Sequence, residues 1–283
     1  APISEAGWAT DKYKAIRELM QKSVKYAIPA IPERIPVIAL PKISLTKTYD
    51  LFTMIKDDKF VESDTLLSFE DLNQGSGYVL YRRHFNQPIE GKMLVKGIAD
   101  YALVYVNGEK VGELNRVFDK DSLEINIPFN STLDILVENM GRINYGARIT
   151  QNRKGILGSV TIDGNDITGD WKMYKIPFDN VPNLASKKEG YGKGLPVVYS
   201  GQFNVDKVGD TFLDMREWGK GIVFVNGINL GRYWKVGPQH TLYLPGCFLK
   251  KGNNDIVIFE QQNDSRKTEL QGITEPILRE LRK

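Results

Sequence analysis

The feature that most constrains the fold of this chain is a strand–turn–strand pattern that occurs twice. Apolar and polar residues alternate through Val223–Gly231 (VFVNGINLG), and an Asn-Gly pair interrupts the alternation. A period of two is typical of a half-buried β-strand, and Asn-Gly between two such runs is the strongest short signal for a hairpin. The stretch Val104–Gly112 (VYVNGEKVG) has the same pattern 119 positions earlier. We therefore expect equivalent hairpins that turn at Asn107-Gly108 and Asn226-Gly227.

Two further blocks extend this repeat in the same order. Tyr81–Phe85 (YRRHF) resembles Tyr199–Phe203 (YSGQF), and Leu133–Glu138 (LDILVE) resembles Asn254–Glu260 (NDIVIFE). The last pair aligns with an offset of 121 at the aspartates and 122 at the glutamates, which makes the two glutamates equivalent. Because strand type, turn chemistry and order recur together, the sequence predicts two all-β sandwich domains of the same kind.

Composition and charge exclude several other classes of protein. The chain has 283 residues, enough for two domains, and its net charge of +3 comes from basic residues scattered among acidic ones. That balance gives no support for a nucleic-acid partner. No run of about 18 apolar residues and no signal-peptide pattern is present, so no membrane partner is expected. The single cysteine, Cys247, allows no intramolecular disulfide and is expected to be a buried thiol.

Residues 1–27 differ from the remainder of the chain because they predict a helix. Thr10 can cap this helix, and the helix should end before Pro29. Its apolar positions form one stripe of four residues, Tyr13, Ile16, Leu19 and Met20. Such a stripe needs a partner, so the helix either packs on a sandwich or belongs to a domain that is absent.

The other boundaries follow from prolines and turns. Four prolines predict an extended linker over residues 28–63: Pro29, Pro32, Pro36 and Pro41. The first sandwich is expected over residues 64–165. The second sandwich and a C-terminal tail are expected over residues 166–283.

The chain lacks the usual signatures of catalysis and of metal or cofactor binding. Its two histidines, His84 and His240, lie on expected strands of different repeats without ligand-spaced partners, so no metal is expected. No nucleophile elbow, phosphate loop or dinucleotide fingerprint is present, so no cofactor is expected either. Glu138 and Glu260 each end an apolar strand, but they belong to different sandwiches. A strand-end glutamate that binds a loop explains them better than a pair of catalytic carboxylates, and no catalytic residue is assigned.

Four aromatic residues are candidates for stacking on a sugar. These weak candidates for substrate binding are Trp171, Trp218, Tyr233 and Trp234. The alternative is that each ring fills a sandwich core or a seam, which is the commoner use of large aromatic residues in such folds.

Several motifs resemble the accessory β-domains of glycoside hydrolase family 35 β-galactosidases. In the first half they are Gly77–Tyr81 (GYVLY), Ala102–Gly108 (ALVYVNG), Leu133–Arg142 (LDILVENMGR), Asn144–Gly146 (NYG) and Arg153–Ile156 (RKGI). In the second half they are Asp210–Asp214 (DTFLD), Trp218–Gly221 (WGKG), Val225–Trp234 (VNGINLGRYW) and Gly237–Gln239 (GPQ). The opening segment, residues 1–21, resembles the part that follows the last strand of that family's catalytic (β/α)8 barrel.

The resemblance implies two jelly-roll (galactose-binding-like) β-sandwich domains after a remnant of the last barrel strand–loop–helix. The family's catalytic glutamates lie on barrel strands upstream of the matched part, and their motifs are absent here. Glu5 lies just behind the last barrel strand but matches neither motif. A barrel also needs about 250 residues of alternating strands and helices, which this chain does not offer.

Three functions follow as alternatives. The chain is the non-catalytic C-terminal portion of a retaining β-galactosidase, where it braces the barrel and is inactive alone; or it is a stand-alone carbohydrate-binding module for galactosides; or it is an independent hydrolase with a new site. The expected partner is the missing barrel. Galactosides and a second copy of the chain, bound through the N-terminal helix, are further candidates, and the parent is expected to be extracytoplasmic if bacterial.

Overall fold

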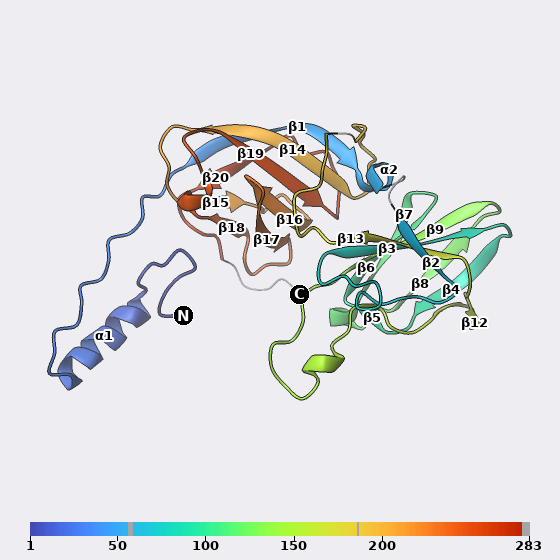
Figure 1. Cartoon of the computed structure of the whole chain (residues 1–283), viewed down its shortest axis with the longest axis horizontal. Coiled ribbons are helices and arrows are strands. Elements are labelled where there is room, and N and C mark those ends of the chain that lie inside the picture. The colour runs from blue at the N-terminus through green and yellow to red at the C-terminus, as the bar shows by residue number, and fades with distance from the viewer. Residues whose placement is uncertain (56–58, 186, 279–283) are drawn as a thin grey trace. The chain divides into compact units, whose positions relative to one another are not determined.

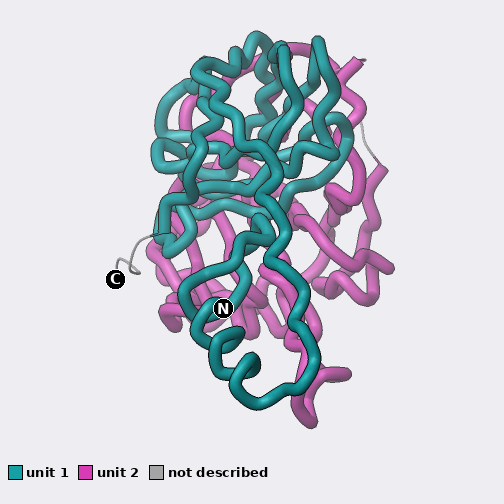
Figure 2. Tube along the Cα trace, turned by 90° about the vertical axis from the view of Figure 1, so that its left-hand side faces the viewer, with its two compact units in different colours: residues 1–48, 197–283 teal, residues 49–196 magenta. Residues whose placement is uncertain are grey.

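The computed structural model describes residues 1–55, 59–185 and 187–278, and strands dominate its elements (Figure 1). The chain divides into two compact units, one formed by residues 1–48 with 197–283 and the other by residues 49–196 (Figure 2). We call them unit 1 and unit 2. No helix in the described ranges combines the length and apolar character needed to cross a membrane.

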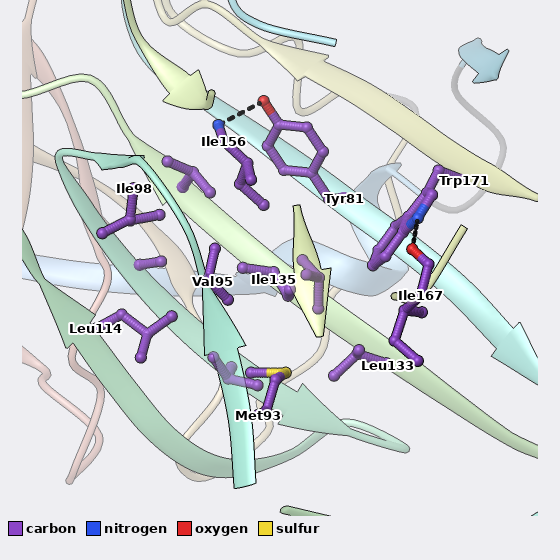
Figure 3. Close-up of a cluster of buried hydrophobic side chains, with 14 of the residues drawn as sticks. Tyr81, Met93, Val95, Ile98, Leu114, Leu133, Ile135, Ile156, Ile167 and Trp171 are labelled. Carbon is purple, nitrogen blue, oxygen red and sulfur yellow. Dashed lines mark hydrogen bonds between the residues drawn. The ribbon is translucent and has the colours of Figure 1, made fainter. Parts of the chain in front are cut away.

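Unit 2 is a β-sandwich with sheets of six and four strands. Its elements are α2 (Leu51–Ile55), β2 (Phe60–Ser63), β3 (Tyr78–Phe85), β4 (Ile89–Val95), β5 (Ile98–Ala99), β6 (Tyr101–Val106), β7 (Glu109–Asn115), η1 (Arg116–Phe118), β8 (Ser122–Ile127), β9 (Ser131–Glu138), η2 (Ile149–Gln151), β10 (Gly155–Ile156), β11 (Val160–Ile162), β12 (Asn165–Asp166) and β13 (Trp171–Ile176). The sheets run β2-β13-β3-β9-β6-β7 and β12-β11-β4-β8, and β10 pairs with β5. Alternate residues of both larger sheets enclose one apolar core, in which Tyr81, Ile135 and Trp171 lie (Figure 3).

Unit 1 contains one sheet of eight strands. Its elements are α1 (Asp11–Ser23), β1 (Leu40–Asp50), β14 (Val197–Val205), β15 (Thr211–Asp214), β16 (Lys220–Val225), β17 (Ile228–Trp234), β18 (Thr241–Leu244), η3 (Gly246–Phe248), β19 (Gly252–Glu260) and β20 (Glu269–Ile273). The strand order is β17-β16-β19-β14-β1-β20-β15-β18. Cys247, expected to be buried, is exposed, because β18 ends at Leu244 and the short helix η3 carries the thiol to the surface.

The predicted repeat is confirmed by the strand order. The run β7-β6-β9-β3 of unit 2 corresponds to β17-β16-β19-β14 of unit 1. Asn107 and Asn226 both have φ of 50°, and the glycines after them have φ of 81° and 86°, as a type I′ hairpin turn requires. Both hairpins also contain a register shift at the same place, after Val104 and after Val223.

The pairing register corrects the predicted equivalence of the two glutamates. Ile135 pairs with Tyr81 and Val104, and Ile258 pairs with the corresponding Tyr199 and Val223. The true offset on this strand is therefore 123, so Gln261 corresponds to Glu138, and Glu260 corresponds to Val137. Successive side chains of a strand point to opposite faces, so the two glutamates do not occupy equivalent sites.

The units also differ from the predicted domain ranges. The expected linker over 28–63 contains β1, which belongs to the eight-stranded sheet and pairs with β20, and β2, which pairs with β13. Residues Trp171–Ile176, expected in the second sandwich, pair with β3 in unit 2. Unit 2 is thus inserted between β1 and β14 of unit 1. The residue after β1 and the residue before β14 are hydrogen-bonded, since the Leu51 N–H donates to the Pro196 carbonyl at 2.8 Å.

Candidate functional site

The N-terminal helix α1 forms as predicted but buries no residue. The Thr10 hydroxyl accepts a hydrogen bond from the Tyr13 N–H at 3.4 Å, and the helix ends at Ser23. Ile16, Leu19 and Met20 are 42%, 67% and 44% exposed. Within unit 1, α1 stands apart from the strands (Figure 1). Three of the four stripe residues are therefore exposed in the described part of the chain, and the fourth, Tyr13, is half-buried.

The residues before α1, in contrast, are attached to the eight-stranded sheet. Trp8 is 8% exposed, and its ring packs edge-on against Phe212 of β15 with 5.7 Å between centroids. The Arg34 guanidinium lies 4.4 Å from the centre of the indole. Ala6 completes this small cluster, so the residues just before α1 pack on the sheet of unit 1. Glu5 lies beside them, where its carboxylate accepts a hydrogen bond from the Gln239 amide at 3.2 Å and burial raises its pKa.

A cavity of about 590 Å³ opens between this attached segment and residues 31–35, which follow the helix. We call it the N-terminal cavity. It is lined by Ile3, Ala6, Gly7, Trp8, Ala9, Tyr13, Lys14, Ile31, Pro32, Glu33, Arg34 and Ile35. The indole Nε1 of Trp8 is buried and has no hydrogen-bond acceptor among the described residues. Sequence reasoning found the stripe but missed this cavity, because its walls come from residues about 25 positions apart that only the fold brings together.

The four aromatic candidates take part in packing. Trp171 is fully buried in the core of unit 2 and its indole N–H donates to the Ile167 carbonyl at 3.1 Å (Figure 3). Trp218, 2% exposed, packs edge-on against Tyr233, and the Tyr233 hydroxyl donates to the Phe259 carbonyl at 2.9 Å. Trp234 is half-buried, with the Lys220 ammonium 4.6 Å from its ring centre. The structure thus brings Trp218, Tyr233 and Trp234 into one part of unit 1, and places Trp171 in unit 2.

Glu260 has the strand-end role that the sequence suggested. Its buried carboxylate accepts hydrogen bonds from the N–H groups of Gly219, Lys220 and Gln262 at 2.8, 3.0 and 2.8 Å. Burial raises the pKa of Glu260 to about 7, while these three hydrogen bonds act in the opposite direction. Both oxygens of the carboxylate therefore accept hydrogen bonds from the backbone, and the side chain has a structural role. Glu138 is also buried, on β9 of unit 2, so the two do not form a catalytic pair.

Unit 2 contains a buried ion pair that the sequence did not reveal. Asp100 and Lys154 are each 1% exposed and lie 2.7 Å apart. The Asp100 carboxylate also forms an ion pair with the Arg116 guanidinium at 2.7 Å and accepts a hydrogen bond from the Met140 N–H at 2.8 Å. The pair fastens both ends of the loop over residues 140–154, whose Tyr145 is 90% exposed. Because the partners are 54 positions apart, no local pattern indicates the pair.

The described residues offer no metal centre. His84 lies on β3, beside the side chains of Asn130 and Thr132, whereas His240 is buried before β18. No group of three or more histidine, cysteine or acidic side chains converges within residues 1–55, 59–185 and 187–278.

Each of the two units contains a segment that is similar to a known protein family. Residues 67–177 match the family "Beta-galactosidase, first all-beta domain", and residues 196–254 match "Beta-galactosidase, galactose-binding domain". The β-galactosidase of Xanthomonas manihotis is 36% identical over 245 residues, covering 86% of this chain and 40% of that protein. Beta-galactosidase 1 of Dictyostelium discoideum (31%; 98% and 46%) and the β-galactosidase of Homo sapiens (35%; 92% and 42%) are also similar. The chain spans less than half the length of these relatives.

Proposed function

Because the chain belongs to the β-galactosidase family, we propose that it forms the non-catalytic C-terminal β-domains of a retaining β-galactosidase and braces its catalytic barrel. The full protein would hydrolyse terminal non-reducing β-D-galactosyl residues. The observation that carries the proposal is that the two family matches fall one in each unit, while the chain spans only 40–46% of the relatives described above. We infer that the catalytic chemistry of these relatives lies in the part of their length that this chain does not cover.

The chemistry of the described residues agrees with a supporting role. Glycoside hydrolysis needs two carboxyl groups that face one sugar, about 5–5.5 Å apart for retention. Glu260 is instead bonded to three backbone N–H groups, and Glu138 is buried in the other unit. The uncovered stripe on α1 supports a partner, since leaving a large apolar side chain in water forfeits about 1.5–3 kcal/mol.

The test is a direct assay on a chromogenic β-galactoside. We expect turnover by the full-length protein and none by this chain, because losing both catalytic carboxylates removes nearly all rate enhancement. Turnover by the chain that survives purification and disappears on substitution of one of its own carboxylates would contradict the proposal.

A galactoside-binding role is the second candidate, since residues 196–254 match a galactose-binding domain. The burial of Trp218 and Tyr233 argues against it, because a ring that stacks on a sugar must expose a face. Titration calorimetry with galactose and lactose distinguishes the two roles. Saturable heat that is lost in Trp234→Ala would favour the binding module.

A further inference from the structure

The loop over residues 140–154 of unit 2 exposes its apolar side chains. Every residue from 141 to 151 is exposed, and the large apolar residues Ile143, Tyr145 and Ile149 are 44%, 90% and 47% exposed. Burial of apolar surface, which fixes the strands of this unit, therefore does not fix the loop. Its position depends on polar contacts at its two ends.

Asp100 joins the two ends of the loop in the interior of unit 2. Its carboxylate accepts the Met140 N–H from one end at 2.8 Å and pairs with the Lys154 ammonium from the other end at 2.7 Å. Arg116, whose side chain is 55% exposed, pairs with the same carboxylate at 2.7 Å. Breaking a buried ion pair is strongly destabilising, because it leaves an uncompensated charge. We call these contacts of Asp100 the inner clasp.

A second carboxylate, Glu70, joins the same two ends at the surface. It accepts a hydrogen bond from Arg142 Nη2 at 2.6 Å and another from the Lys154 N–H at 3.0 Å. Arg153 pairs with the neighbouring Asp71 at 2.5 Å and lies 3.8 Å from Glu70. The side chains of Glu70 and Asp71 are 33% and 45% exposed, so water and salt weaken these contacts more than those of the inner clasp. We call the contacts of Glu70 and Asp71 the outer clasp.

Protonation opens the outer clasp, because a neutral carboxyl group no longer pairs with arginine. Burial acts to raise the pKa of Glu70, but hydrogen bonds from Arg142 and from the backbone lower it overall, and hydrogen bonds from Ser68 lower the pKa of Asp71. Burial raises the pKa of the adjacent Tyr81 hydroxyl, which stays neutral in acid. Because both carboxyl pKa values are lowered by folding, the clasp is complete above the ordinary values of 4.5 and 3.8 and is lost as the pH falls through the lowered ones.

We propose that loop 140–154 is a two-stage latch, in which acid releases the outer clasp and the inner clasp continues to hold both ends. In the released state Arg142 and Arg153 lose their carboxylate partners, and the residues between them move about the two fixed ends. A loop that is already fixed loses less conformational entropy when its tip binds. The closed latch therefore presents Tyr145 preorganised, and acid removes that advantage. The latch lies within unit 2 and does not rest on the proposed function.

Amide hydrogen exchange, resolved to single residues in this chain, reads the two clasps separately. The Lys154 N–H reports on Glu70, and the Met140 N–H reports on Asp100. Between pH 6 and pH 3 the protection factor of Lys154, which corrects for the intrinsic exchange rate, should fall about tenfold, the effect of one lost hydrogen bond to a charged group. Glu70→Gln imitates the protonated acid, so it should show the lower protection already at pH 6 and remove the pH dependence.

The inner clasp is tested at pH 6. Glu70→Gln should leave the protection of Met140 unchanged, whereas Asp100→Asn should lower the protection of Met140 and Lys154 by about tenfold or more, because it removes the carboxylate that joins them. If Asp100→Asn does not fold, Arg116→Gln weakens the same clasp from the surface and should lower the protection of Met140 by a smaller factor.

Glu109→Gln is the matched control, since it makes the same change at an exposed residue of β7 and should keep the pH dependence of the wild type. The buried Ile135 should stay protected throughout, which shows that unit 2 remains folded. The inference is wrong if the protection of Lys154 is equal at pH 6 and pH 3, or if its fall persists in Glu70→Gln. Equal losses at Met140 and Lys154 in Glu70→Gln would mean a single clasp, and a fall shared by Ile135 would mean that acid unfolds unit 2; either result overturns the latch.

Discussion

Asn226 explains why the repeated hairpins turn on asparagine rather than on any residue that tolerates a positive φ. Its amide nitrogen donates to the Phe248 carbonyl and to Asn254 Oδ1, both at 2.8 Å, and its Oδ1 accepts the Asp255 N–H at 3.0 Å. In the other unit Asn107 bonds in the same way to Ser131 and to the Thr132 N–H. Each asparagine therefore ties its turn to the start of the neighbouring strand.

Asn226→Ala should lower the free energy of unfolding of unit 1 by about 2–3 kcal/mol, since it removes these hydrogen bonds and leaves a strained φ. Asn226→Gly removes the same hydrogen bonds but adopts the positive φ without strain, so it should destabilise unit 1 less than Asn226→Ala does. Gly227→Val should destabilise by about 1–3 kcal/mol through backbone strain. Urea unfolding measures all three. The control Asn253→Ala, at an exposed residue of β19, should change stability by less than about 0.5 kcal/mol; an equal loss there would refute the anchoring role.

Glu260 predicts a specific pH dependence. Burial raises its pKa in the folded state to about 7, above the ordinary value of 4.5, so the folded protein binds this proton more tightly than the unfolded chain does. Its contribution to stability is therefore complete below pH 4.5 and is lost as the pH rises through 7. This loss is at most about 3 kcal/mol. Between pH 5 and pH 8 the wild type should lose stability relative to Glu260→Gln in urea titrations, and exposed Glu217→Gln should follow the wild type. Parallel pH profiles for wild type and Glu260→Gln would exclude a raised pKa.

Strand β1 marks the limit of what the sequence predicts at the scale of elements. The hairpins and the repeat were predictable because Asn-Gly and the alternation are local signals. β1 was not, because prolines precede it and its partner β20 lies more than 200 positions away. The repeat offset of 123 on β19 and the Asp100–Lys154 ion pair were also not predictable from local patterns, because both depend on residues that are distant in the sequence. The burial of Trp171, Trp218 and Tyr233 also follows from partners on other strands, which the sequence does not order in space.

The assignment of β1 to the eight-stranded sheet can be tested at Ile43, which is fully buried. Ile43→Ala should destabilise unit 1 by about 2–5 kcal/mol, the usual effect of truncating a buried isoleucine. Thr46→Ala, at an exposed position of the same strand, is the control and should be nearly neutral. Exchange rates resolved to β14 and β20 locate the effect. A neutral Ile43→Ala would mean that residues 40–50 are a linker after all.

For the molecule as a whole, the N-terminal segment has two parts with opposite roles. Ala6 and Trp8 pack on the sheet of unit 1, whereas α1 buries nothing within the described chain. The first part should stabilise the isolated chain and the second should matter only with the barrel present.

A matched pair of variants separates the two roles. Trp8→Ala should lower the stability of the isolated chain by about 3–5 kcal/mol, because it leaves a space against Phe212. The triple change Ile16→Gln, Leu19→Gln and Met20→Gln replaces exposed side chains, so each should alter the stability of the isolated chain by less than about 0.5 kcal/mol. In the full-length protein the triple change should lower the thermal midpoint, since three amides would then be buried against the barrel without partners. If it destabilises the isolated chain as strongly as Trp8→Ala does, the stripe is covered by this chain's own residues. An unchanged midpoint in the full-length protein would show that α1 does not contact the barrel.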